Sequence, residues 1–153
     1  MEKLDSIDRK ILGIIQNDCS LHKKEIADKV GLSLTATYER IKRMERTGII
    51  EAYVAKLNRD KIGKSLVAFC TVSLKAHSKP LLKKFEAKIR GIDDVVECFH
   101  TTGTFDYLLK IAVSDMKAYQ DLLINKLSSI EYIALIQSSF VMTDVKDKSI
   151  YVM

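Results

Sequence analysis

The chain has 153 residues, of which 47% are hydrophobic and 29% charged, and its formal net charge is +5. These values are typical of a globular protein with one ordinary domain or two small ones, and they exclude bulk disorder. No apolar run approaches the roughly 18 residues that a membrane span requires, and the N-terminal residues lack the layout of a signal peptide. We therefore expect a soluble, cytoplasmic protein with no membrane partner.

The positive charge is concentrated in the first part of the chain. Residues 1–64 contain 14 Lys and Arg against 10 Asp and Glu, whereas residues 65–153 contain 11 against 10. This asymmetry indicates an N-terminal half that faces a polyanion and a C-terminal half with another task. Taken alone, it is a weak indication.

The first 47 residues show the apolar spacing of three short helices. In the first helix, Asp5 is placed to cap the N-terminus, and Asp8 is the acidic residue of the first turn. The second helix is expected from about residue 22 to Val30, with Gly31 as its left-handed stop. The apolar stripe of the first helix consists of Ile7, Ile11, Ile14 and Ile15.

Ser33 is placed to cap the third helix, which Gly48 ends before an alternating stretch at residues 49–57 that predicts a strand. Two helices joined by a short turn at a glycine form the helix-turn-helix motif, and Gly31 tolerates the positive φ of that turn. In this motif the core braces one side of the second helix, so that its other side can enter the major groove of DNA. The sequence therefore predicts a winged-helix-like, DNA-binding helix-turn-helix domain over residues 1–48 and a strand linker over residues 49–64.

The third helix, residues 34–46, combines an apolar side with a cationic side. On a helical wheel Leu34, Tyr38, Ile41 and Met44 cluster on the side that we expect to be buried. Small residues near the start of the opposite side permit close approach to base edges, and arginines can reach guanines or phosphates. The predicted DNA-binding residues are the capping serine, this outward face and its flanks: Ser33, Thr35, Ala36, Glu39, Arg40, Lys42, Arg43 and Arg46.

Glu39 is an acid inside this cationic face. It can accept a hydrogen bond from a cytosine amino group or orient Arg43 four residues later, and we favour the second role. A charged helix face is by itself more often only a solvated surface. The capped turn, the small residues at the start of the helix and the charge asymmetry together favour DNA binding.

The second half of the chain repeats a pattern. The segments 88–99 and 126–137 match at a separation of 38 residues; each follows an amphipathic helix and leads into a strand. With strands at residues 66–74 and 105–113, the order becomes strand, helix, strand, strand, helix, strand, which is the ferredoxin-like plan. The fold class is therefore α+β, with a C-terminal ferredoxin-like αβ sandwich over residues 65–153.

In this plan the two helices cover one face of the sheet and leave the other bare. The strands are apolar on both faces, so we expect the bare face to pack against another copy of the chain. A homodimer is the expected consequence. The apolar residues that motivate it are Val67, Phe69, Leu108 and Ile111.

Residues 100–109, HTTGTFDYLL, connect the two central strands. A tight hairpin needs a flexible residue, which Gly103 supplies. By the residues alone, the simpler interpretation of Asp106 is a polar loop residue.

The Cys and His residues indicate neither a metal site nor a disulfide framework. The three cysteines contain no CxxC pair, and the three histidines share no ligand spacing with acidic residues. We expect Cys70 and Cys98, which lie in strand-like runs, to pack as small hydrophobic residues. No nucleophile with a base, no paired carboxylates and no phosphate loop appears either, so we predict no catalytic residue and no cofactor.

Four segments together resemble the Lrp/AsnC (feast/famine) family of transcriptional regulators over nearly the whole chain. They are LDSIDRKIL at residues 4–12, EIADKVGLS at 25–33, ERIKRMERTGII at 39–50 and GTFDYLLKI at 103–111. The resemblance implies an N-terminal helix-turn-helix joined by a strand to an αβ ligand-sensing domain. It also implies residues 34–46 as the recognition helix, and dimers that assemble into higher oligomers.

By the same resemblance, Gly103 and Asp106 correspond to a G-x-x-D loop that lines a small-molecule pocket between neighbouring dimers. The usual effectors of the family are amino acids. The backbone around Gly103 and Thr104 would meet the ligand, with the Asp106 carboxylate near its ammonium group, a charge-assisted contact that fixes a zwitterion's orientation. The inner residues of the loop, Thr104 and Phe105, do not specify which amino acid binds. Further implied wall residues are Thr101, Thr102, Ser138 and Ser139.

Two other classes of protein remain to be compared with a regulator. One is a small-molecule enzyme on a ferredoxin-like scaffold, which measurable turnover would support. The other is an architectural DNA-binding protein without effector sensing, which would give no sequence-specific footprint that shifts with an amino acid. We favour a sequence-specific regulator whose assembly or DNA binding responds to a small effector.

Overall fold

The computed structural model describes residues 3–147 and 150–152. The chain divides into two compact units, one of residues 1–56 with 146–153 and one of residues 57–145. The sequence did not indicate that residues 146–147 and 150–152 group with the N-terminal unit. Within the described residues, no helix combines the length and the apolar character needed to cross a membrane.

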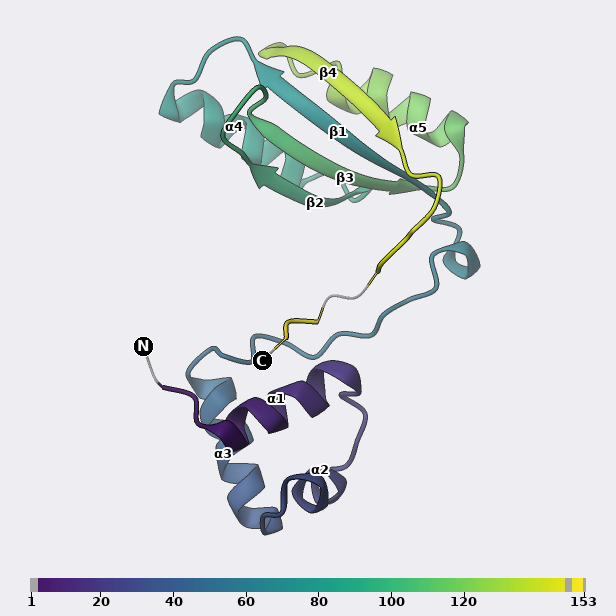
Figure 1. The fold of residues 1–153 in the computed structure, drawn as a ribbon. Coiled ribbons are helices and arrows are strands. Elements are labelled where there is room, and N and C mark those ends of the chain that lie inside the picture. Colours follow the sequence, from purple (N-terminus) through teal and green to yellow (C-terminus); the bar gives the residue numbers. More distant parts are fainter. Residues whose placement is uncertain (1–2, 148–149, 153) are drawn as a thin grey trace. The chain divides into compact units, whose positions relative to one another are not determined.

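The N-terminal unit contains three helices, α1 (Ser6–Asn17), α2 (Lys23–Val30) and α3 (Leu34–Arg46) (Figure 1). The Asp5 carboxylate accepts hydrogen bonds from the backbone of Ile7 and Asp8, and the Asp8 carboxylate accepts one from the backbone of Asp5. This reciprocal capping box fixes the start of α1 and confirms the predicted cap. The helices enclose a small core of Ile11, Leu12, Ile15, Ile26, Ile41 and Met44.

The turn between α2 and α3 has the predicted geometry. Gly31 adopts the left-handed conformation with φ 71°, and the Leu32 amide donates to the carbonyl of Ala27 at 3.1 Å. A side chain at Gly31 would be strained in this conformation, because L residues rarely adopt positive φ. Gly48, with φ 73°, follows α3 in the same way.

The strand predicted at residues 49–57 is not formed in this chain. Residues 51–58 have no regular secondary structure, and a short 3-10 turn, η1 (Asp60–Ile62), follows them. A strand is stable only when a neighbour pairs with its backbone, and no described strand lies beside this segment. Tyr53, Val54 and Leu57 therefore remain exposed.

The C-terminal unit has the predicted ferredoxin-like order. Its elements are β1 (Leu66–Leu74), α4 (Lys79–Arg90), β2 (Val95–His100), β3 (Tyr107–Val113), α5 (Met116–Leu122) with a π-helical turn η2 (Leu123–Leu127), and β4 (Ile133–Phe140). The strands form one antiparallel sheet in the order β2-β3-β1-β4, and α4 and α5 lie on the same face of it (Figure 1).

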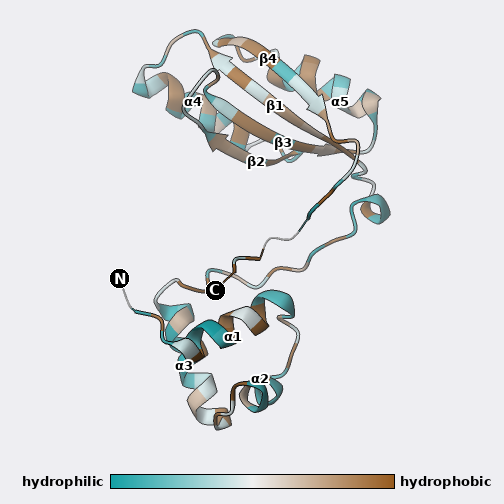
Figure 2. Cartoon of the chain, in the orientation of Figure 1, coloured by the Kyte–Doolittle hydropathy of each residue, from teal (hydrophilic) through white to brown (hydrophobic). Residues whose placement is uncertain are grey.

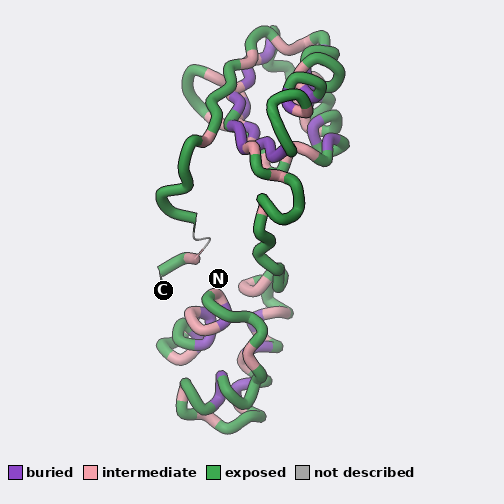
Figure 3. The backbone as a smooth tube through the Cα atoms, turned by 90° about the vertical axis from the view of Figure 1, so that its right-hand side faces the viewer, coloured by how far each residue is buried: buried purple, intermediate pink, exposed green. Residues whose placement is uncertain are grey.

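Strand alternation separates the side chains of this unit into two sets. Hydrophobic residues run along β1 and β3 (Figure 2), and the buried ones gather where the helices meet the sheet (Figure 3). The core lies on the helix side, where Cys70, Val72 and Leu109 pack with Phe85 of α4 and Tyr119 of α5.

The bare face of the sheet presents Phe69, Phe99, Leu108 and Leu135, three of which are exposed and one half-buried. Ile111 does not belong to this face, contrary to the prediction. It pairs in register with Ala68 and is fully buried in the core under the helices, because its position differs by an odd number from that of Leu108.

Candidate functional site

The exposed side of α3 carries most of the predicted DNA-binding residues. The Ser33 hydroxyl accepts a hydrogen bond from the Ala36 backbone at 3.2 Å and caps the helix as predicted. From there, one side of the helix presents exposed polar side chains, while Ala36 is half-buried. The exposed residues are Thr35, Glu39, Lys42 and Arg46.

The buried side of α3 differs from the wheel. Leu34 and Tyr38, expected to face inward, are 52% and 38% exposed. The buried residues are instead Thr37, Ile41 and Met44, because a polar residue, Thr37, takes the position at the centre of the core-facing side. The hydroxyl of Thr37 has no hydrogen-bond partner among the described residues. A pattern based on hydrophobicity alone could not identify this position.

 Leu34 and Tyr38 line a hollow of about 600 Å³, and its other walls are Leu21, His22, Lys23 and Thr35. The Lys23 ammonium lies 4.4 Å from the centroid of the Tyr38 ring, a cation–π contact that holds a positive charge beside the start of α3.

Two arginines on the flank of α3 contact the first helix. The Arg40 guanidinium lies 2.6 Å from the Asp5 carboxylate and 2.8 Å from that of Asp8. The Arg43 guanidinium lies 2.6 Å from the other oxygen of Asp8. Asp8 is only 1% exposed, whereas the two arginine side chains retain part of their exposure. The structure therefore places Arg40 and Arg43 beside α1, away from the centre of the outward face.

This acid–arginine network joins the cap of α1 to the recognition helix. The backbone amide of Asp8, together with Arg40, lowers the pKa of Asp5 to about 2, so the carboxylate stays ionised. Charge-assisted hydrogen bonds of this kind are stronger than neutral ones and fix orientation. The sequence holds one signal that could have indicated a buried partner for Asp8, since this acid stands three residues before Ile11 on the buried stripe of α1.

The predicted effector loop closes through its own backbone. The Thr101 amide donates to the Asp106 carbonyl at 2.8 Å, and the Thr101 hydroxyl donates to the Phe105 carbonyl at 3.1 Å. At the tip, Gly103 has φ 127°, a conformation that favours glycine. Thr102, Gly103 and Thr104 are exposed, so their backbone is accessible to a ligand.

The Asp106 carboxylate is only 19% exposed, and both of its oxygens have partners. One accepts a hydrogen bond from the Leu74 amide at 2.7 Å, and the other lies 2.8 Å from Nε2 of His77. His77 itself is 63% exposed and can move aside. Asp106 therefore anchors the loop to the end of β1. Sequence analysis missed His77, because it follows β1 and is distant from the loop in the chain.

The two serines of β4 do not lie beside this loop within one chain. Ser138 pairs in register with Cys70 and faces α5, where its hydroxyl contacts the Tyr119 hydroxyl. Ser139 pairs with Phe69 and points to the bare face. Because β4 is two strands from β3, about 10 Å separates the serines from the hairpin across the sheet.

No group of three or more His, Cys, Asp or Glu side chains within residues 3–147 and 150–152 is arranged to hold a metal ion. Tyr119 is buried in the core, and its hydroxyl contacts that of Ser138 on β4. Burial, with the neighbouring Cys70, raises its pKa to about 12, so the phenol keeps its proton. It serves as a hydrogen-bonding group inside the core.

Comparison with known proteins agrees with both halves of the structure. Residues 4–51 match a family model described as winged helix-turn-helix DNA-binding, and residues 67–151 match one described as the Lrp/AsnC ligand binding domain. The chain is 38% identical over 149 residues to the Bkd operon transcriptional regulator of Pseudomonas aeruginosa, with 97% of each chain covered. It is 36% identical over 146 residues to the leucine-responsive regulatory protein of Escherichia coli K12, covering 95% of this chain and 89% of the relative.

Among solved structures, a transcriptional regulator of Neisseria meningitidis in complex with L-methionine superimposes with a TM-score of 0.92 at 33% identity. The match covers 96% of this chain and 95% of that one. The first relative is named as a transcriptional regulator and the second as a regulatory protein, in agreement with the expectation that the chain is not an enzyme. The ligand-binding domain favours an effector-responsive regulator over an architectural protein. The chain belongs to the Lrp/AsnC family of transcriptional regulators.

Proposed function

We propose that this regulator reads DNA with the exposed face of α3 and responds to an amino acid bound at the loop of residues 101–106. The exposed, capped and cationic face of α3 is the observation that carries the DNA-binding part. Because its target is DNA, we place the protein in the cytoplasm beside the chromosome. The residues proposed to contact DNA directly are Ser33, Thr35, Ala36, Glu39, Lys42 and Arg46.

Arg40 and Arg43 have a different part in this proposal. Their guanidinium groups contact Asp5 and Asp8, so their first task is to hold α3 against α1. The exposed portion of each side chain can still meet a phosphate at the edge of the groove. Because Asp8 holds the Arg43 guanidinium, we assign base contacts to residues nearer the centre of the face, foremost Thr35 and Glu39.

Arg46→Ala should weaken binding to specific and random duplexes equally. Arg46 is exposed at the end of α3 and forms no ion pair with any residue in the described part of the chain, so it is available to a phosphate. Loss of one phosphate contact should reduce the slope of log K against log salt by about 0.9. Titrations at several salt concentrations measure this slope. The matched control is Arg9→Ala, which removes an exposed arginine of α1 and should leave the slope unchanged. An unchanged slope in Arg46→Ala would remove that contact.

The effector part of the proposal rests on the geometry of the loop. Residues 102–104 are exposed and share a loop with Asp106, whose carboxylate can pair with the ammonium group of a zwitterion. The Neisseria regulator with L-methionine supports an amino acid as the class of effector. Thr101, Thr102 and, from a neighbouring subunit, Ser138 and Ser139 complete the proposed site. A thermal-shift screen of the twenty amino acids tests this part, because a ligand that binds only the native state raises its stability.

We also propose that the chain forms a homodimer through the bare face of its sheet, and that dimers assemble further. Phe69, Phe99 and Leu135 are exposed on that face, which no helix of the described chain covers. The unpaired segment with Tyr53, Val54 and Leu57 presents additional apolar side chains. Exposed apolar surface of this extent is typical of an interface.

Phe69→Asp should shift the dimer toward monomer, because a charge would be buried at the centre of the proposed interface. Sedimentation velocity of the full chain at micromolar concentration measures the species present. Ile124→Asp is the matched control, since Ile124 is an exposed apolar residue on η2, which lies outside the sheet. A dimer that persists unchanged in Phe69→Asp would show that the bare face is not the interface.

A further inference from the structure

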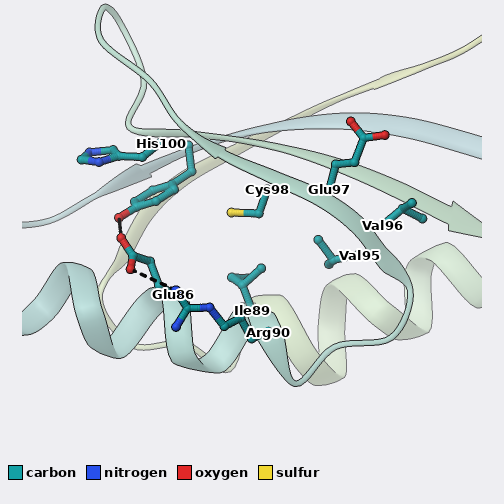
Figure 4. Close-up of a pocket in the computed structure, with 9 residues that line it drawn as sticks. Glu86, Ile89, Arg90, Val95, Val96, Glu97, Cys98 and His100 are labelled. Atoms are coloured by element: carbon teal, nitrogen blue, oxygen red, sulfur yellow. Dashed lines mark hydrogen bonds and ion pairs between the residues drawn. The ribbon is translucent and has the colours of Figure 1, made fainter. Parts of the chain in front are cut away.

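A second hollow lies between α4 and β2 of the C-terminal unit (Figure 4). Its volume is about 480 Å³, within the range of roughly 300 to 1,000 Å³ that small-molecule sites occupy. Because β2 is an edge strand, no further strand of the described residues closes this side of the sheet. We call the hollow the α4–β2 groove; it is lined by Glu86, Ile89, Arg90, Val95, Val96, Glu97, Cys98, His100 and Tyr107.

One end of the α4–β2 groove carries two opposite charges. The Arg90 guanidinium and the Glu86 carboxylate lie 3.7 Å apart, which is longer than a hydrogen bond. The other oxygen of Glu86 accepts a hydrogen bond from the Tyr107 hydroxyl at 3.2 Å. Burial, with the Glu86 carboxylate, raises the pKa of Tyr107 to about 12, so this phenol remains a donor and holds Glu86 in place. The Arg90 guanidinium can therefore still donate hydrogen bonds to a ligand, and the Glu86 carboxylate can still accept one from it.

Apart from Glu97 and His100, the rest of the groove is apolar. Ile89 and Tyr107 are buried at its base, and Val95 is half-buried beside them. Cys98 was predicted to pack as a hydrophobic residue, but it is exposed, because the strand that carries it lies at the sheet edge. Figure 4 shows the Cys98 side chain pointing toward the helix between Glu86 and Val95. A ligand side chain that entered the groove would therefore meet carbon and sulfur atoms.

We propose that the α4–β2 groove binds a small zwitterion with an apolar side chain, an amino acid by class. Its carboxylate would pair with the Arg90 guanidinium, and its ammonium group with the Glu86 oxygen that faces Arg90. Its side chain would pack against Val95 and Cys98. This site goes beyond the proposed effector loop, because all its residues come from one chain. The two sites are neighbours, since His100 and Tyr107 directly flank the loop of residues 101–106.

Alkylation of Cys98 by iodoacetamide, followed by mass spectrometry of the full chain's peptides, tests the proposal. Partial burial, with the nearby Glu86, raises the pKa of the Cys98 thiol, so the reaction is run at mildly alkaline pH. L-leucine at ten times its Kd should slow the alkylation of Cys98 about tenfold by mass action. The exposed Cys19 of the other unit is the internal control and should react at an unchanged rate.

Two analogues of leucine test the requirement for a zwitterion. 3-Methylbutylamine lacks the carboxylate and 4-methylpentanoate lacks the ammonium group, and both should protect Cys98 far less than L-leucine. Equal protection by all three compounds would overturn the roles of Arg90 and Glu86. Absence of protection by L-leucine and by each of the other apolar amino acids would overturn the site itself.

Variants separate this groove from the effector loop. Arg90→Gln and Glu86→Gln should abolish protection; glutamine at position 86 can still accept the Tyr107 hydrogen bond, so the fold is retained. Asp106→Asn should leave the protection of Cys98 intact even where it removes the response of DNA binding. If Asp106→Asn abolished protection while the two glutamine variants kept it, the shielding of Cys98 would arise at the loop, and the groove site would be wrong.

Discussion

Asp8→Ala is expected to lower the free energy of unfolding of the N-terminal unit by about 2 to 4 kcal/mol. The substitution removes a buried carboxylate that binds Arg40 and Arg43 and also completes the capping box of α1. Each charge-assisted hydrogen bond contributes about 1.5 to 3 kcal/mol. The total stays below the sum, because the partly exposed arginines can turn to water once their partner is gone.

Hydrogen exchange with mass spectrometry on the full chain measures this loss locally. Amides of α1 and α3 should lose protection in Asp8→Ala, whereas amides of β1 and β3 in the other unit should not change. Asp28→Ala removes an exposed acid from α2 and is the matched control. Protection in α1 and α3 that equals the wild-type value would show that the network does not stabilise the unit.

The same network changes how DNA-binding defects should be interpreted. Removing Arg43 takes away one of the two cations that compensate the buried Asp8, so α3 loses a brace as well as a cationic side chain. Part of any loss of DNA affinity in Arg43→Ala would then come from a shift of the whole helix α3, and only the rest from the lost side chain. Arg46 forms no ion pair within the described residues, so the DNA affinity of Arg46→Ala measures the loss of its DNA contact more directly.

Local signals allowed most of the fold to be predicted. Caps at Asp5 and Ser33 and the left-handed stop at Gly31 act within a few residues, so their effect can be read without knowing the tertiary structure. The alternation of side chains between the two faces of β1 and β3 likewise depends only on residues that are neighbours in the sequence. The ferredoxin-like order followed from the sequence of these elements along the chain.

What the sequence did not reveal depends on contacts between distant residues. Thr37 is buried although it is polar, and Asp8 meets arginines more than thirty residues away. The stretch at residues 49–57 has the alternation of a strand, but no strand in the described part of the chain pairs with it. In the candidate effector site, the contact of His77 with Asp106 could not be inferred from the loop's own residues.

Asp106→Asn is expected to weaken the binding of the best-screening amino acid by about 10- to 150-fold, which corresponds to about 1.5 to 3 kcal/mol for a charge-assisted contact. Asparagine retains an oxygen that can accept from the Leu74 amide, so the loop keeps its anchor while losing the charge that pairs with an ammonium group. Asp106→Ala should weaken binding at least as much and also loosen the loop. Calorimetric titration measures the ligand affinity of both variants. The matched control is Asp121→Asn, which neutralises an exposed acid on α5.

The same variants test how the loop communicates with DNA. Asp106 lies in the C-terminal unit and the DNA face on α3 in the other, so a ligand can alter DNA binding only if its affinity differs between assembly states. Both variants should therefore keep the ligand-free affinity for DNA and lose the ligand's effect on sedimentation and on operator binding. His77→Ala isolates the remaining partner of the carboxylate: if an ammonium group displaces His77, ligand affinity should rise in this variant. Unchanged ligand affinity in Asp106→Asn and Asp106→Ala would remove Asp106 from the site and leave it as the residue that anchors the hairpin to β1.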